Sequence, residues 1–563
     1  MDTEKLDASL KTLRDNATAW AQMPLNKRIS YLDGLLRGTF EVADSQVKEA
    51  VKQKGVPPGS AMAAEDYLGG PVVQARTIRL MLETLRTIEK QGRITIPAKK
   101  IKDVGDGQIA VEVVPHELTD KLLFTGFSAS IWMEPGVTRE NLSDHIAEFY
   151  RTEPSSRKGR LALVLGAGNV SSIGPLDVVH KLFVEGQVCL LKMNPVNDYL
   201  GPFFEQIFAH LIKDGFVDTA YGGADVGDYL CQHALVDEIH ITGSDRTHDA
   251  IVFGVGDEGA ERKATNRPRN TKRITSELGN VSPVIVMPGS WTESDLRFQA
   301  ENIASQMTNN GGFNCNAAKL IILHEDWTQK TEFMDMLRSV LASLEQRPAY
   351  YPGAEERYDR FVGAHPHAQP IGDRGEGVLP WTIIPDLDSN KTDDICFTQE
   401  SFCGVTAQTT LPGEDAGRFL QNAVHFCNDV VWGTLNACII VHPQTEKRFS
   451  AIIEQALGDL KYGSVAVNHW PALCYGMGAT AWGAYPGHTL DDIQSGIGFV
   501  HNSGLFDRPQ KSVLRGPFRV APKPPWFVTH TRSMGVAQRM ASMEVSPSIW
   551  KIPGIAWQAM RGS

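Results

Sequence analysis

Apolar residues in the first hundred positions recur at helical spacing. Leu6, Leu10, Leu13 and Trp20 are separated by three, four or seven residues, and the segment 77–88 (TIRLMLETLRTI) carries a similar stripe. This spacing places the apolar side chains on one face of a helix. The pattern therefore predicts a helical N-terminal region.

The period changes near residue 108. The segments 109–117 (IAVEVVPHE) and 121–135 (KLLFTGFSASIWMEP) are β-branched and aromatic runs separated by polar residues. Such runs are typical of half-buried strands, so they predict antiparallel strands or an extended arm.

Strands and helices then alternate along the chain. An apolar strand at 161–165 (LALVL) precedes a predicted helix at 175–186 (PLDVVHKLFVEG), and a second strand follows at 188–192 (VCLLK). Another predicted strand lies in the segment 238–244 (EIHITGS) and ends at Gly243 and Ser244. A second series of helices and strands occupies residues 295–468. Repeated strand–helix–strand units predict parallel strands with right-handed crossovers, and hence doubly wound sheets.

The ends of these strands supply the first site candidates. Ligands of doubly wound sheets bind beyond the carboxyl ends of the strands. Asn169, Lys192, Gly243 and Ser244 fall at such ends, so we expect them to line a ligand site.

Composition narrows the class of protein. The 563 residues are 42% hydrophobic and carry a formal net charge of −11, which favours two to four globular domains and opposes binding of nucleic acid. The N-terminus (MDTEKLDASL) lacks the basic and apolar regions of a secretory signal, and no run approaches the ~18 apolar residues of a membrane span. We expect a soluble cytoplasmic protein without integral membrane association.

The eight cysteines form no CxxC pair, and no histidine cluster has zinc-finger spacing. Neither a disulfide framework nor a metal site is therefore predicted. Most of the thiols are expected to be buried, and a reactive one must be recognised by its neighbours.

A glycine-rich turn invites a nucleotide-binding interpretation. Gly166, Gly168 and Ser171 follow a strand and precede a helix, nearly as in the glycine fingerprint of dinucleotide-binding folds. The next strand, however, ends in Lys192 where the fingerprint requires an acidic residue. The missing acidic residue therefore favours a tight turn, in which the glycines permit unusual dihedral angles, over the classical fingerprint.

Cys315 and Glu277 are the candidates for chemistry. Cys315 lies in MTNNGGFNCNAAKL, where Gly311 and Gly312 permit a close backbone approach and neighbouring amides can stabilise an oxyanion. Glu277 ends a strand in ITSELGN, where a carboxylate could activate water. Taken singly, an inert buried thiol and a solvated carboxylate are the simpler interpretations.

The order of these segments matches a known family: the chain resembles the aldehyde dehydrogenase superfamily, as a divergent, bacterial-type member. That family carries an Asn loop, a strand-end Lys, a TGS turn, and ELGGKSP, GQxC and ExFGP segments. The corresponding segments here are Asn169, Lys192, Thr242–Ser244 (TGS), Glu277–Pro283 (ELGNVSP), Gly311–Cys315 (GGFNC), Glu400–Val405 (ESFCGV) and Tyr462–Asn468 (YGSVAVN). So many matches in order are hard to obtain by chance.

The resemblance implies a fold with two doubly wound α/β domains and a small β oligomerisation arm. On this basis residues 1–107 and 150–277 form the dinucleotide-binding domain and residues 278–500 the catalytic domain. Residues 108–149 and 501–563 form the arm and a C-terminal extension. A homodimer or homotetramer is expected.

The resemblance also implies a reaction, the oxidation of a small aldehyde to a carboxylic acid. Cys315 would attack the aldehyde, and the Asn169 amide with the Cys315 N–H would hold the oxyanion. After hydride transfer, Glu277 would activate water to hydrolyse the thioester.

NAD or NADP is the implied cofactor. Lys192 would bind the adenosine ribose or a 2'-phosphate, Gly243 with Ser244 would approach the pyrophosphate, and Glu400 with Phe402 would hold the nicotinamide ribose. NAD-preferring members usually carry Glu three residues after the lysine, where this chain has Pro195. The resemblance therefore leaves the choice between the two cofactors open.

Several departures leave other functions open. AGN replaces the usual PWN before the oxyanion asparagine, and Cys403 and Gly404 replace the Gly–Pro of FGP. Alternatives are transfer of the acyl group to coenzyme A, a non-catalytic binding or structural member, or a cysteine hydrolase without cofactor. Glu277 favours hydrolysis over transfer to coenzyme A, because CoA-acylating members commonly lack the base.

Two C-terminal features remain open. Four aromatic residues follow the Asn468 strand: His469, Trp470, Tyr475 and Trp482. They indicate either a preference for an apolar or aromatic aldehyde or a packed contact between subunits. The basic, Trp-containing tail after Pro517 is expected to pack on the body or on a neighbouring subunit, although such tails also contact membranes or partners.

Overall fold

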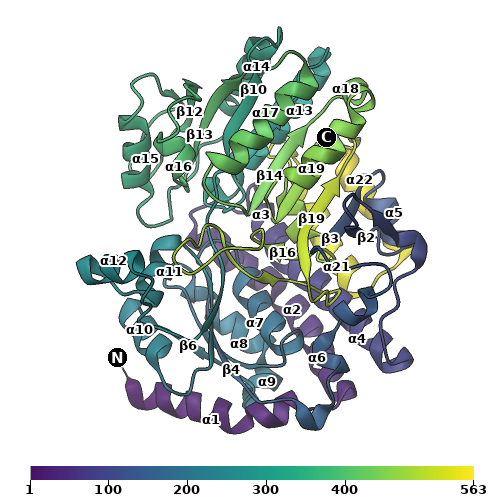
Figure 1. The fold of residues 1–563 in the computed structure, drawn as a ribbon, viewed down its shortest axis with the longest axis vertical. Coiled ribbons are helices and arrows are strands. Elements are labelled where there is room, and N and C mark those ends of the chain that lie inside the picture. Colours follow the sequence, from purple (N-terminus) through teal and green to yellow (C-terminus); the bar gives the residue numbers. More distant parts are fainter. Residues whose placement is uncertain (1) are drawn as a thin grey trace.

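Two sheets, one above the other in Figure 1, organise the chain, and the computed structural model describes residues 2–563. The lower sheet has six strands in the order β17-β8-β7-β4-β5-β6, all parallel except β17. Its strands are β4 (Leu161–Leu165), β5 (Val188–Lys192), β6 (Val217–Ala220), β7 (Glu238–Thr242), β8 (Arg273–Glu277) and β17 (Gly496–Ile497).

The upper sheet has eleven strands in the order β1-β2-β3-β19-β15-β14-β9-β10-β13-β12-β11. The seven strands from β19 to β12 are parallel, and the outer strands are antiparallel. The strands are β1 (Ile101–Asp103), β2 (Ile109–Val114), β3 (Ser128–Met133), β9 (Ser282–Val286), β10 (Ala318–His324), β11 (Gln369–Ile371), β12 (Trp381–Leu387), β13 (Val405–Leu411), β14 (Asn436–Ile440), β15 (Ser464–Val467) and β19 (Pro509–Arg515); β16 (Trp482–Gly483) and β18 (Phe499–Val500) form a separate ribbon.

Helices cover both sheets. Strands that are buried on both faces in this way are apolar along their whole length. The strand β4 reads LALVL and is almost completely buried. The N-terminal helices are α1 (Thr3–Ala21), α2 (Leu25–Gln53), α3 (Ala63–Tyr67), a π-helical turn η1 (Leu68–Val72) and α4 (Val73–Gln91). Around the lower sheet lie α7 (Ile173–Phe183), α8 (Gly201–Ile207), α9 (Ala209–Lys213), α10 (Ala224–Gln232), α11 (Asp245–Val252) and α12 (Gly256–Ala264).

The remaining helices belong to the upper half and the connections. They are α13 (Glu293–Thr308), α14 (Lys330–Ala342), α15 (Ala354–Gly363), α16 (Ile395–Thr398), α17 (Ala416–Asp429), α18 (Pro443–Arg448), α19 (Ser450–Asp459) and α20 (Ala472–Gly476), with α5 (Leu118–Leu123) and α6 (Glu148–Arg151) near the arm, and α21 (Ser533–Val545) and α22 (Ile552–Gly562) in the tail. None of the helices in residues 2–563 combines the length and the apolar character that a membrane crossing needs.

The predicted helical N-terminus and the two doubly wound sheets are confirmed. The strand prediction for 121–135 was wrong at its start, because α5 occupies Leu118–Leu123 and the strand begins only at Ser128. Helix α5 contacts α22 of the tail, and this tertiary contact is invisible to a local pattern.

The predicted arm does not project from the body. Its strand β3 pairs with β19 of the same chain, and β19 pairs with β15, so the arm extends the chain's own upper sheet. The proposed domain boundaries and a subunit contact through this arm stay predictions.

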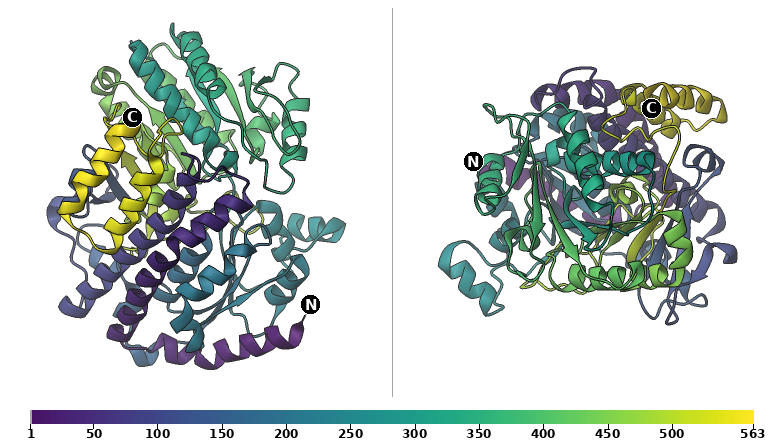
Figure 2. Two further views of the ribbon diagram at one scale, coloured as in Figure 1. Left: turned by 180° about the vertical axis from the view of Figure 1, so that it is seen from behind. Right: turned by 90° about the horizontal axis from the view of Figure 1, so that it is seen from above.

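The C-terminal tail packs on the body of its own chain. Helix α21 lies against α2, α3 and α4, and Figure 2 shows the tail helices beside the long N-terminal helices. A buried ion cluster fixes this contact: Glu544 accepts from Arg76 at 2.9 Å and from Arg79 at 2.7 Å, and Arg76 also donates to Asp120. Removal of one partner from such a cluster leaves an uncompensated buried charge.

We predict that Glu544→Gln lowers the free energy of unfolding by about 3 kcal/mol, because both arginines lose a buried counter-ion. The matched control is Glu454→Gln, since Glu454 pairs with Arg515 while its side chain is 58% exposed; a loss below about 1 kcal/mol is expected there. Urea unfolding measures both values. Equal losses would show that the cluster does not hold the tail.

Candidate functional site

All eight site residues predicted from the sequence line one cavity. The cavity has a volume of about 1230 Å³, and its walls include Asn169, Lys192, Gly243, Ser244, Glu277, Cys315, Glu400 and Phe402. It lies at the carboxyl ends of strands β4, β5, β7 and β8, where doubly wound sheets bind ligands. Its volume exceeds the roughly 300–1,000 Å³ of most small-molecule sites, so an elongated ligand fits.

A strained turn presents Cys315 to this cavity. After α13, the 3₁₀ turn η6 (Asn309–Gly312) carries φ angles of 54° at Asn310, 72° at Gly311 and 80° at Gly312. A Cβ at Gly312 would lie 2.7 Å from the backbone carbonyl carbon of Cys403. Glycine is therefore required both by the left-handed backbone and by the close approach.

The Cys315 thiol faces a buried carboxylate. Its Sγ donates to Glu277 Oε1 over 3.3 Å, and Glu277 Oε2 is buried without a hydrogen-bond partner in residues 2–563. Cys315 is partly exposed, whereas the other seven cysteines are buried. The least buried of the cysteines therefore lies beside the carboxylate that the sequence proposed as a base.

Burial and neighbouring negative charges raise the pKa values of both Glu277 and Cys315. Burial raises the pKa of Glu277, while the nearby Trp482 indole and the Cys315 thiol moderate the rise. The pKa of Cys315 is raised well above its usual range by burial and by the charges of Glu277 and Glu400, and Lys319 opposes this effect. Both shifts favour the protonated, uncharged form of each group.

Two N–H donors are available beside the sulfur. The Asn169 side-chain amide donates to the Phe313 carbonyl over 2.9 Å, and an amide nitrogen carries a second hydrogen. The Cys315 N–H makes no hydrogen bond with any group of residues 2–563. Both donors can therefore serve an oxyanion that forms next to Cys315.

A second cavity adjoins the first at Cys315. It has a volume of about 150 Å³ and shares Asn169, Ile173, Glu277 and Cys315 with the large cavity. Its other walls are mostly apolar and aromatic: Leu68, Val72, Val73, Phe124, Trp470, Leu473, Tyr475, Met477, Trp482, Trp526 and Met540. Three of the four aromatic residues singled out after Asn468 line it, whereas His469 is buried against Phe127 and the Pro517 carbonyl.

The large cavity carries charged and hydrogen-bonding groups along its wall. Lys192 lies at the end of β5, and Ser244 caps the N-terminus of α11 through a bond from the Thr247 N–H of 3.2 Å. Glu400 forms an ion pair of 3.0 Å with the buried Lys319. A Cβ at Gly279 would lie 2.0 Å from Glu400 Oε2, so only glycine there lets the carboxylate reach the cavity wall.

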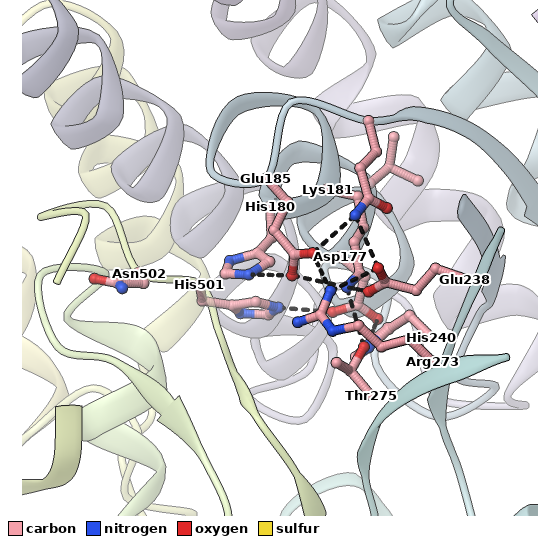
Figure 3. A network of polar contacts seen from close by, with 12 residues as sticks. Asp177, His180, Lys181, Glu185, Glu238, His240, Arg273, Thr275, His501 and Asn502 are labelled. Atoms are coloured by element: carbon pink, nitrogen blue, oxygen red, sulfur yellow. Dashed lines mark hydrogen bonds and ion pairs between the residues drawn. The ribbon is translucent and has the colours of Figure 1, made fainter. Parts of the chain in front are cut away.

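A buried polar network underlies the TGS turn and the strand that ends in Glu277 (Figure 3). Asp177 of α7, fully buried, accepts from Thr242 over 3.1 Å and from His501 Nε2 over 2.9 Å. His240 joins Asp177 to Thr275, and Lys181 bonds Thr275 over 3.0 Å. The network thus ties β7 and β8 to α7, and the Gly243 N–H bonds the Glu277 carbonyl over 3.0 Å.

Sequence reasoning missed several residues of the site, among them Lys319, Trp526 and Met540. Lys319 follows Cys315 by four positions, but nothing in its neighbours shows that it is buried and paired with Glu400. Trp526 and Met540 reach the small cavity from the tail. The sequence shows both residues, but it does not show where the tail packs.

The chain resembles known proteins in sequence. The model of the Aldehyde dehydrogenase family matches residues 178–355. A 1-pyrroline-5-carboxylate dehydrogenase of Bacillus cereus (strain B4264) is 23% identical over 299 residues, which are 51% of this chain and 53% of that protein. Matches to curated relatives span between 40% and 53% of their own length.

The fold is similar to solved structures over most of the chain. An NAD-dependent aldehyde dehydrogenase from Sinorhizobium meliloti shares 16% identity with a TM-score of 0.60, covering 93% of this chain and 89% of that one. A glyceraldehyde-3-phosphate dehydrogenase GapN from Methanocaldococcus jannaschii, complexed with NADP, also shares 16% identity with a TM-score of 0.60, covering 92% and 95%. At such identities the likeness concerns the fold.

We predict that Glu277→Gln makes Cys315 more reactive in the absence of ligand. The carboxylate raises the pKa of the thiol, so its removal lowers that pKa, and each unit increases the thiolate fraction about tenfold below the pKa. Alkylation by iodoacetamide at one fixed pH, followed by mass spectrometry of the Cys315 peptide, measures the rate. The exposed Glu454→Gln serves as control, and an unchanged rate in Glu277→Gln would contradict the assigned contact.

Proposed function

We propose that this chain, a member of the aldehyde dehydrogenase superfamily, oxidises an aldehyde to a carboxylic acid with NAD or NADP as the electron acceptor. One observation carries the proposal: the Cys315 thiol contacts the Glu277 carboxylate at the junction of a large polar-lined cavity and a small apolar one. The large cavity suits a dinucleotide, and the small one suits the carbon chain of an aldehyde. The two ligands would then meet at the sulfur.

The first step uses the contact between the two side chains. Glu277 takes the proton of the Cys315 thiol, and the thiolate attacks the aldehyde carbon to form a thiohemiacetal. The oxygen that becomes negative accepts hydrogen bonds from the Asn169 amide and the Cys315 N–H, a type of contact worth about 3 kcal/mol per donor. A dinucleotide, when bound, supplies the hydride acceptor that converts this adduct into a thioester.

In the second step Glu277 acts as a base toward water. Once its proton has passed to solvent, the carboxylate removes a proton from water, and the resulting hydroxide attacks the thioester carbon. The carbon–sulfur bond breaks, the carboxylic acid leaves, and Cys315 is restored. The raised pKa of Glu277 supports this role, because a base works best when its pKa lies near the working pH.

Five residues would hold the dinucleotide. Lys192 would contact the adenosine ribose or a 2'-phosphate, the turn of Gly243 and Ser244 would approach the pyrophosphate, and Glu400 with Phe402 would hold the nicotinamide ribose. Acidic and basic side chains both line the cavity around Lys192, among them Asp225, Arg246 and Arg269. This mixture supports binding of either NAD or NADP.

The apolar cavity favours a neutral apolar or aromatic aldehyde. Apart from Glu277 beside the sulfur, its two charged wall residues are already compensated, because Glu65 pairs with Arg347 at 2.6 Å and Arg76 pairs with Asp120 and Glu544 at 2.9 Å. A charged substrate would find no free counter-ion among these groups, and burial of an unpaired charge is costly.

An activity assay tests the function. The purified protein is incubated with a panel of aldehydes and NAD or NADP, with and without coenzyme A, and the formation of reduced cofactor is measured. We expect turnover without coenzyme A, release of carboxylic acid, and no activity in Cys315→Ala. Turnover that requires coenzyme A would replace hydrolysis by acyl transfer. A complete absence of reduced cofactor with every aldehyde would reject the proposed oxidation.

We predict that Glu277→Gln gives at most one equivalent of reduced cofactor and then stalls, with the acyl group on Cys315. Without the carboxylate the pKa of the Cys315 thiol falls, so the thiol loses its proton to solvent and still forms the adduct that precedes hydride transfer. Hydrolysis follows hydride transfer, and glutamine cannot deprotonate water. Rapid mixing measures the burst, and intact mass spectrometry detects the acyl-enzyme. An undiminished steady rate would exclude Glu277 as the base.

We predict that Trp526→Ala lowers kcat/KM for benzaldehyde about tenfold and changes kcat/KM for acetaldehyde much less, because the aromatic ring loses a wall of its pocket. Trp550→Ala is the matched control, since Trp550 lies in the same tail but is 85% exposed. Equal effects of the two substitutions, or equal effects on both aldehydes, would contradict the assigned pocket.

A further inference from the structure

Three different metal-binding side chains converge outside the cavity described above. His365 follows α15, and Asp394 and Cys396 lie at the start of α16, 29 and 31 residues further along. Their ligand atoms all lie within 4.8 Å of one another, and among residues 2–563 this is the one such group of His, Cys, Asp or Glu. The chain separation explains why no motif revealed it.

The histidine is oriented as a metal ligand requires. His365 Nδ1 lies 2.6 Å from the Phe361 carbonyl oxygen, so Nδ1 carries the hydrogen and donates it there. In the neutral ring Nε2 is then an acceptor, and it faces both Asp394 oxygens at 3.1 and 3.2 Å. An acceptor nitrogen and a carboxylate oxygen at this distance need a shared proton or a cation between them. In metal-bound histidines the other ring nitrogen usually donates to a backbone carbonyl or a carboxylate, as His365 Nδ1 does here.

The separations fit a tetrahedral cation. Zinc with ordinary bond lengths holds a nitrogen and an oxygen ligand roughly 3.4 Å apart, and a nitrogen and a sulfur ligand roughly 3.6 Å apart. Here the nitrogen–oxygen distances are 3.1 and 3.2 Å and the nitrogen–sulfur distance is 3.9 Å. Side-chain shifts of a few tenths of an ångström would bring these two separations to the zinc values, and the Asp394 oxygen and the Cys396 sulfur lie within 4.8 Å of each other.

We propose that His365, Asp394 and Cys396 bind one divalent cation of the zinc class. Imidazole with thiolate selects zinc or cobalt over magnesium and calcium. Cys396 is buried, whereas His365 and Asp394 are 11% and 18% exposed, so water can reach the fourth position. On binding, the Cys396 thiol loses its proton to solvent and the sulfur coordinates the cation.

The position of this site gives the cation a structural consequence. Helix α15 carries Arg357, which donates to the Phe402 carbonyl over 3.3 Å, and α16 leads directly into Glu400. A cation held by His365 and by the start of α16 therefore ties together the two segments that flank one wall of the large cavity. This proposal does not depend on the proposed oxidation.

Cobalt titration of the full chain tests the site. The Cys315→Ala background removes the active-site thiol, and chelator treatment followed by dialysis removes prior metal. We expect one equivalent of Co²⁺ to bind with a sulfur-to-cobalt charge-transfer band, and Zn²⁺ to displace it and to raise Tm. Cys396→Ser abolishes the band, and His365→Gln weakens binding at least tenfold.

Matched controls separate this site from other cysteines and histidines. Cys427→Ser changes another buried thiol, and His425→Gln changes an exposed imidazole nearby in sequence; both should leave the band and the Zn²⁺-induced rise in Tm intact. A chain that binds no cobalt, or a band that persists in Cys396→Ser, would show that His365 and Asp394 form only a proton-sharing pair. His365→Gln retains the thiol and provides the second readout if Cys396→Ser folds poorly.

Discussion

The contact between the Cys315 thiol and the Glu277 carboxylate depends on where the two sheets meet. Glu277 ends β8 of the six-stranded sheet, and within five residues the chain enters β9 of the eleven-stranded sheet, whose neighbour β10 begins just after Cys315. Ser282 at the start of β9 donates to the Cys315 carbonyl over 3.0 Å, and the Glu277 carbonyl accepts from Gly243 over 3.0 Å. One crossing segment therefore positions both groups, and a shift of either sheet would separate them.

The same junction divides the surroundings of the sulfur into two chemical environments. On one side lie lysine, glutamate and glycine backbone, which suit a polar and elongated ligand. On the other side lie tryptophan, tyrosine and methionine around a cavity of about 150 Å³. Burial raises the pKa of both Glu277 and Cys315. In the proposed reaction one proton passes between these two groups.

The C-terminal tail belongs to the site as well as to the scaffold. Glu544 is anchored on Arg76 and Arg79, and this ion cluster holds α21 so that Met540 and the preceding Trp526 close the apolar cavity. The arm has a related property, because β3 completes the edge of the chain's own sheet through β19. Segments that local pattern assigned to an extension therefore determine the shape of a pocket more than a hundred residues away in sequence.

The sequence by itself determined the alternation of strands and helices, the strand-end positions of Lys192, Ser244 and Glu277, and the nucleophile candidate Cys315. These features are local: apolar periodicity, glycine at positive φ and ordered motifs act within a few residues. Only the tertiary structure decided that α5 replaces a predicted strand, that Trp526 lines a pocket, that Lys319 pairs with Glu400, and that His365 meets Cys396. Those contacts join distant segments, and their energies come from burial and charge pairing that exist only after the sheets have formed.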